Sequence, residues 1–134
     1  MSIQKSEIQL NVNDKKVNAH LANGGGAGVL VLHAWWGLKP FFKEICDQLA
    51  EQGFTALAPD LRDGQIAKTI DDAKALMEKS DGQFVGDVVM AAKDYLRGIV
   101  NGKIGVIGFS MGAAWALVIA STQPEQIAAI VLFY

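Results

Sequence analysis

The sequence is poor in the residue types that build disulfide-linked or metal-bound folds. It has one cysteine, Cys46, and two histidines, His20 and His33, among its 134 residues. A single cysteine cannot form an internal disulfide, and these scattered side chains are too few for a typical zinc site. We therefore expect no structural metal, and we predict that Cys46 is a small buried hydrophobe.

The sequence also lacks a large excess of charge of one sign and lacks long apolar runs. Twelve basic and 14 acidic residues give a net charge of −2, without a basic cluster, which argues against a nucleic-acid partner. No stretch reaches the roughly 18 apolar residues of a membrane span, and the start has no signal-peptide pattern. The sequence thus predicts a cytoplasmic protein without a membrane partner, and its 51% hydrophobic content predicts one globular domain over residues 1–134.

What is present is an alternation of strand and helix patterns. Alternating apolar residues around Asn13 and Asp14 predict an antiparallel hairpin, residues 8–12 and 17–21, at a sheet edge. After a flexible glycine-rich connector at 24–28, apolar runs predict strands at 29–32, 54–58, 104–107 and 127–133. Helical spacing predicts helices at 41–52, 70–77, 84–99 and 113–120. This order predicts an α/β fold with a doubly wound, mostly parallel sheet.

The most specific motif is the run 108–112, Gly-Phe-Ser-Met-Gly, between a predicted strand and a predicted helix. A serine hydroxyl needs exposure, a nearby base and a group that stabilises the oxyanion it creates. A strand-to-helix turn lifts Ser110 out of the sheet, while Gly108 and Gly112 leave room for the backbone to turn tightly. The motif therefore predicts a nucleophile elbow with Ser110 as the catalytic residue.

Two backbone N–H groups are candidates for the oxyanion hole. Met111 opens the helix after Ser110, so its N–H and the helix dipole point toward the developing negative charge. Neighbouring strands present their carboxyl ends to the same crevice, which predicts that the loop after strand 29–32 supplies the second donor, the N–H of Trp35. The next residue, Trp36, is a candidate wall of the substrate pocket.

A catalytic base is missing from the expected place. In this arrangement the chain order is serine, then an acid, then histidine, yet the residues after Gly112 include no histidine and one acidic residue, Glu125. His33 precedes the predicted oxyanion loop, and we interpret it as a residue that orders this loop. We interpret Asp60 and Asp63 as solvated loop carboxylates rather than as the triad acid.

Three segments resemble the dienelactone hydrolase family of α/β-hydrolases: residues 29–37, residues 49–61 with the sequence LAEQGFTALAPDL, and residues 103–113 around Ser110. The resemblance implies an α/β-hydrolase fold and the hydrolysis of a small ester or lactone through an acyl-enzyme, without a metal or organic cofactor. It also implies that residues 1–134 form the N-terminal two thirds of a member, with the acid and histidine beyond residue 134.

Two departures from the family pattern refine this hypothesis. Family members that act on dienelactone resemble one another in having a cysteine nucleophile and a glutamate in the loop after the first central strand. This chain has Ser110 in place of the cysteine and Ala34 in place of the glutamate. The departures favour a general serine carboxylesterase. One alternative is a non-catalytic α/β binding module that has lost its base. Another is self-association, in which two copies pair through the apolar strand 127–133.

Overall fold

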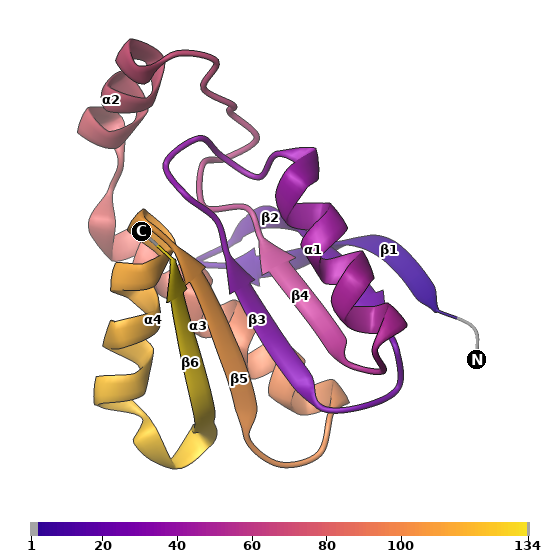
Figure 1. Cartoon of the computed structure of the whole chain (residues 1–134). Helices are drawn as coiled ribbons and strands as arrows, with labels where there is room; N and C mark the ends of the chain where they lie inside the picture. The colour runs from indigo at the N-terminus through magenta and orange to yellow at the C-terminus, as the bar shows by residue number, and fades with distance from the viewer. Residues whose placement is uncertain (1–2, 134) are drawn as a thin grey trace.

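In the described part of the chain, six strands form one mixed sheet in the order β1-β2-β4-β3-β5-β6 (Figure 1). The computed structural model describes residues 3–133. The strands are β1 (Gln4–Val12), β2 (Lys15–Asn23), β3 (Gly28–Leu32), β4 (Thr55–Pro59), β5 (Ile104–Phe109) and β6 (Ile127–Phe133). The pairs β1/β2 and β2/β4 are antiparallel, whereas the pairs β4/β3, β3/β5 and β5/β6 are parallel. The predicted edge hairpin and mostly parallel sheet are confirmed.

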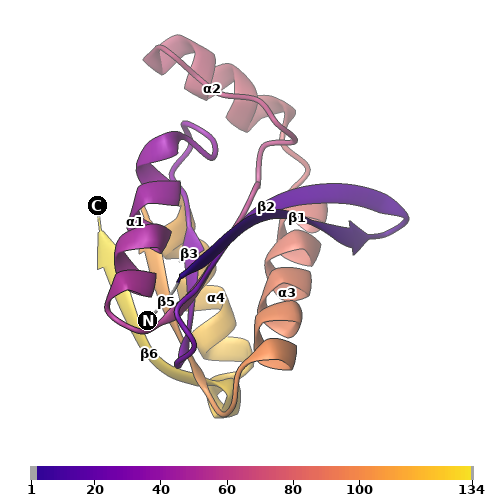
Figure 2. The same ribbon diagram turned by 90° about the vertical axis from the view of Figure 1, so that its right-hand side faces the viewer.

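Helices cover both faces of this sheet (Figure 2). They are α1 (Pro40–Glu51), α2 (Ile70–Lys79), α3 (Gly82–Ile99) and α4 (Met111–Thr122), followed by a short 3₁₀ turn, η1 (Pro124–Gln126). Helix α1 packs on one face, α3 and α4 pack on the other, and α2 projects beyond the carboxyl ends of the parallel strands. Within residues 3–133, no helix has both the length and the apolar character needed to cross a membrane.

Strand β3 shows why this arrangement is stable. All five of its residues are buried, because successive side chains point to opposite faces and both faces are covered. Leu30 and Leu32 join the core under α3 and α4, while Val29 and Val31 join the core under α1. Cys46 is fully buried in the second core, so the prediction of a small core hydrophobe is confirmed.

The predicted helices and strands all occur, with small shifts at their ends. Helix α1 begins at Pro40, whose missing N–H costs nothing in a first turn. Helix α3 begins two residues earlier than the spacing predicts, because the Asp81 side chain accepts a hydrogen bond from the Gln83 N–H and caps the helix. Strand β4 includes Pro59, which lies opposite Ala19 of β2.

The glycine-rich connector between β2 and β3 is closely packed. A Cβ on Gly24 would lie 2.4 Å from the carbonyl oxygen of Ala50, and one on Gly26 would lie 2.2 Å from that of Gly53. Glycine is therefore needed at these two positions because the backbone of the connector touches the end of α1.

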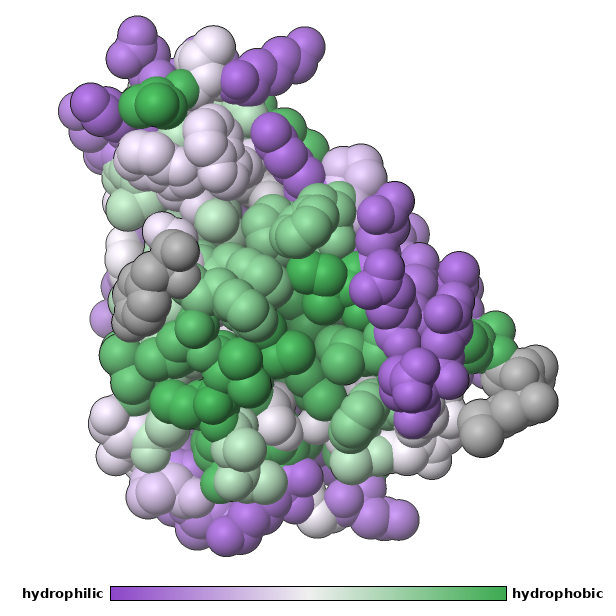
Figure 3. Space-filling model, in the orientation of Figure 1, coloured by the Kyte–Doolittle hydropathy of each residue, from purple (hydrophilic) through white to green (hydrophobic). Residues whose placement is uncertain are grey.

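Strand β6 has one open side. Among residues 3–133 it pairs only with β5. Its apolar side chains Val131 and Phe133 are 48% and 50% exposed. Figure 3 shows the apolar surface that covers this part of the molecule, next to the polar surface around α1. The edge is thus available for pairing with another polypeptide segment.

Candidate active site

Ser110 occupies the turn between β5 and α4. It has φ +53° and ψ −106°, and its side chain is exposed. Such a conformation is strained for a non-glycine residue and persists only where the surrounding structure holds it. One restraint is the Ser110 N–H, which donates a hydrogen bond to the carbonyl oxygen of Phe133 at 2.7 Å. This geometry is that of a nucleophile elbow.

The two glycines of the motif allow β5 and α4 to meet so closely. A Cβ on Gly108 would lie 2.4 Å from the carbonyl oxygen of Gly112. A Cβ on Gly112 would lie 2.2 Å from the carbonyl oxygen of Leu32 and 2.8 Å from that of His33. Gly108 thus makes room for the turn itself, whereas Gly112 lets the start of α4 touch the end of β3.

That contact brings the elbow beside the loop that follows β3. The loop turns at residues 34–37, where the Gly37 N–H donates to the carbonyl oxygen of Ala34 at 3.3 Å. Neither the Trp35 N–H nor the Met111 N–H donates a hydrogen bond to a backbone group within residues 3–133. An oxyanion hole requires N–H donors that no backbone acceptor occupies. The assignment of these two N–H groups to an oxyanion hole stays a prediction.

His33 is fully buried at the end of β3 and uses both ring nitrogens. The Leu61 N–H donates to Nε2 at 2.9 Å, so the proton is on Nδ1, which donates to the carbonyl oxygen of Ala34 at 2.6 Å. Burial lowers the pKa of His33 to about 4, so the ring is neutral at pH 7. His33 therefore fastens the β3 loop to the β4 loop and has no free nitrogen for catalysis.

The other titratable side chains that are candidates for the base or the acid of a catalytic serine also have hydrogen-bond or ion-pair partners. The Asp60 carboxylate accepts hydrogen bonds from the N–H groups of Arg62 and Gly64, both at 2.8 Å. Asp63 pairs with Lys15 at 2.8 Å. The second histidine, His20, lies between two carboxylates at the hairpin and α1. No group of three or more metal-binding side chains occurs within residues 3–133. The described chain thus supplies a serine without a base.

Two apolar hollows meet at Ser110. One, of about 370 Å³, has aromatic walls that include Trp36, Phe41 and Phe109. The other, of about 430 Å³, is lined by Trp35, Met77 of α2 and residues of α4. The two indoles pack edge to face, with ring centroids 5.8 Å apart. Trp35 and Trp36 thus belong to different hollows, and Ser110 lines both of them.

The sequence analysis did not identify several residues of these hollows. Met77 reaches the site because α2 projects over it, and nothing in the local pattern of residues 70–79 predicts that position. Phe109 and Phe133 stack at a centroid distance of 5.0 Å on adjacent strands. Strand alternation and the β5/β6 pairing would have placed these two rings on one face.

Comparison with known proteins points to one family. The chain is 38% identical over 138 residues to Protein usf of Aquifex pyrophilus and 37% identical to a putative carboxymethylenebutenolidase of Aquifex aeolicus; each match covers 95% of this chain. The solved structure m3DLH superposes with a TM-score of 0.83 at 27% identity and covers 99% of this chain. The chain spans about 60% of the length of each of these proteins.

The match to a family model agrees with these relatives. Residues 17–134 match the model of the dienelactone hydrolase family. The strand order, the elbow between β5 and α4 and the superposition on known members together identify the α/β-hydrolase fold. The chain therefore belongs to the dienelactone hydrolase family.

Proposed function

We infer that this chain carries the nucleophilic part of a serine hydrolase that cleaves small apolar esters or lactones. The observation that carries this proposal is the conformation of Ser110, exposed at φ +53° between two apolar hollows. A strained, exposed serine at a strand-to-helix turn is costly for stability and useful for nucleophilic attack. Family membership supports the same class of reaction.

The reaction follows the acyl-enzyme route. Ser110 Oγ attacks the carbonyl carbon while a base accepts the hydroxyl proton, and the Trp35 and Met111 N–H groups stabilise the negative oxygen. Collapse of the tetrahedral intermediate expels the alcohol, which takes the proton from the protonated base. Water then attacks the acyl-enzyme, releases the acid and restores Ser110. These steps need no metal or organic cofactor.

The substrate class follows from the walls of the hollows. Aromatic side chains line one hollow, and Trp35, Met77 and Met111 line the other, so groups on both sides of the carbonyl would lie against apolar surface. Burial of such groups contributes roughly 25 cal/mol per Å² of apolar area. We expect binding to strengthen with apolar length on either side. The name carboxymethylenebutenolidase, carried by relatives, supports a lactone as one such substrate.

The base and the acid would come from polypeptide other than residues 1–134. His33 has no free ring nitrogen and His20 lies at the hairpin, so neither is placed to accept the Ser110 proton. The chain spans about 60% of its relatives, which leaves length in those proteins for further catalytic groups. Without a base, triad enzymes retain about 10³–10⁴ of acceleration over water. Residues 1–134 alone would therefore turn over slowly.

The same absence of a base favours one alternative function. A non-catalytic binding module would keep the apolar hollows and lose only the proton transfer. Such a protein would bind apolar ligands at the hollows and would not hydrolyse them.

Hydrolysis of p-nitrophenyl esters tests the proposal and separates it from this alternative. The sample should be the whole gene product, including anything encoded after residue 134, and acetate, butyrate and hexanoate esters should be compared. We expect Ser110→Ala to lower kcat/KM by at least 10³-fold, and the exposed Ser121→Ala to leave it unchanged. Equal rates for wild type and Ser110→Ala would refute the proposal, and ligand binding without turnover would establish the binding module.

A further inference from the structure

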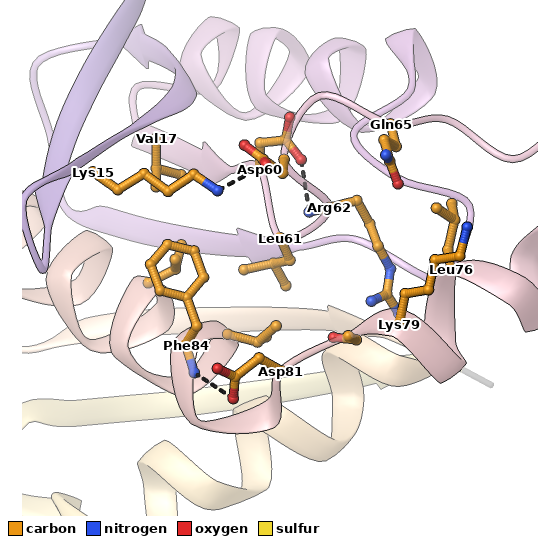
Figure 4. A pocket seen from close by; sticks show the side chains of 14 residues that line it. Lys15, Val17, Asp60, Leu61, Arg62, Gln65, Leu76, Lys79, Asp81 and Phe84 are labelled. Carbon is orange, nitrogen blue, oxygen red and sulfur yellow. Dashed lines mark hydrogen bonds and ion pairs between the residues drawn. The ribbon is translucent and has the colours of Figure 1, made fainter.

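A third cavity lies on the α3 side of the sheet and shares no lining residue with the two hollows at Ser110. Its volume is about 280 Å³, and its walls come from β2, the connection between β4 and α2, the end of α2 and the start of α3 (Figure 4). Ser110 is not among its lining residues. The cavity is more polar than the hollows, since three cationic and three anionic side chains line it.

Arg62 is the unusual member of this lining. It is only 5% exposed, yet its Nε has no hydrogen-bond acceptor within residues 3–133. Its Nη2 contacts two methionine sulfurs, that of Met111 at 2.7 Å and that of Met77. Thioether sulfur is a weak acceptor, and a guanidinium has five N–H donors. Burying a charge with so few acceptors costs free energy unless a strong acceptor meets it.

The carboxylates of the cavity do not fill this need. The two oxygens of Asp60 accept from backbone N–H groups, and an oxygen of Asp81 caps α3. Asp63 pairs with Lys15. Burial lowers the pKa of Arg62, and the nearby charge of Asp60 opposes this effect, so the guanidinium stays protonated at pH 7.

A second cationic side chain lines the same cavity. Lys79, the last residue of α2, lines the cavity and forms no ion pair within residues 3–133. Figure 4 shows the Arg62 side chain extending toward the end of α2 that carries Lys79. Two positive side chains from separate segments therefore line one small cavity.

We propose that this cavity binds a small oxyanion, a phosphate or a carboxylate, between Arg62 and Lys79. The planar guanidinium fork matches the geometry of both anions, and an ammonium group adds a flexible point charge. An anion there would give the guanidinium a stronger acceptor than the two thioether sulfurs. This proposal does not depend on whether Ser110 is a nucleophile, because its test measures anion binding and not hydrolysis.

Anion titration tests the proposal. The protein is titrated with inorganic phosphate and, separately, with acetate, each against sodium chloride at matched ionic strength, by calorimetry and by thermal unfolding. We expect saturable binding of at least one anion and a rise in Tm with its concentration. Saturation by phosphate but not acetate assigns a phosphate ligand, and the reverse assigns a carboxylate. No saturable effect of either anion would overturn the proposal.

Three variants locate the site. Arg62→Gln should weaken binding at least tenfold, and Lys79→Gln at least threefold, because each removes a charge-assisted hydrogen bond. Lys103→Gln is the control, since it removes one exposed positive charge that does not line the cavity; its affinity should not change. Retained affinity in Arg62→Gln would overturn the site. If that variant does not fold, unchanged affinity in the exposed Lys79→Gln would overturn it instead.

Discussion

At the scale of single residues, Gly112 is the most tightly packed position of the elbow. An added Cβ would lie 2.2 Å from the Leu32 carbonyl oxygen, so Gly112→Ala must push α4 away from β3. We expect it to lower the free energy of unfolding by about 1–3 kcal/mol. The control is Gly98→Ala in α3, where an added Cβ meets nothing within 4 Å. That change should raise stability by about 0.5–1 kcal/mol. Urea unfolding of both variants measures the contrast, and equal effects would contradict the packing account.

His33 makes stability depend on pH. Its pKa is about 4 in the folded chain and about 6.5 when unfolded. Between these values the unfolded state binds more protons, so the contribution of His33 to stability is complete above about pH 6.5 and is lost as the pH falls toward 4. The loss is at most about 1.4 kcal/mol per pH unit.

The variant His33→Gln isolates this contribution. Its amide oxygen can still accept from the Leu61 N–H, but it does not titrate. Urea unfolding at pH 7 and pH 4.5 should show the wild type losing about 2–3 kcal/mol more than the variant. All other titrating groups are shared by the two proteins. If the difference in free energy of unfolding between the wild type and His33→Gln does not change with pH, His33 is not a buried neutral ring.

At the scale of helices and strands, periodicity predicted the elements but not every placement. Strand β3 was recognisable because a strand covered on both faces has only apolar residues, and α3 because its buried side chains recur at helical spacing. The elbow was recognisable because the motif stands between two such elements. The position of α2 over Ser110 was not, because it depends on the course of residues 60–69 and not on local pattern. The burial of Arg62 was not predictable either, because it also depends on the course of residues 60–69.

The open side of β6 predicts self-association of the 134-residue chain. Its N–H and C=O groups on that side are unpaired within residues 3–133, and half-exposed Val131 and Phe133 add apolar area. We expect light scattering to show a mass that rises with protein concentration. Val131→Lys should suppress the rise, because a charge on an edge strand opposes pairing, whereas Lys103→Gln should not. A wild-type monomer at every concentration would contradict this prediction.

At the scale of the whole molecule, the described fold places a candidate nucleophile, two candidate oxyanion donors and two apolar hollows at the carboxyl ends of β3 and β5. It spans about 60% of the length of its relatives. The strand order positions the elbow, because Gly112 at the start of α4 can touch Leu32 of β3 only if β3 and β5 are neighbours in the sheet. The proposed function assigns nucleophilic attack to residues 1–134 and proton transfer to other polypeptide.

The central claim is that Ser110 is an activated nucleophile, and covalent labelling tests it most directly. The whole gene product is treated with a fluorophosphonate probe, digested and analysed by mass spectrometry, alongside Ser110→Ala and Ser121→Ala. The account predicts one labelled peptide that contains Ser110, lost in Ser110→Ala and kept in Ser121→Ala. Absence of label on the folded protein, or equal labelling of Ser110→Ala, would contradict it.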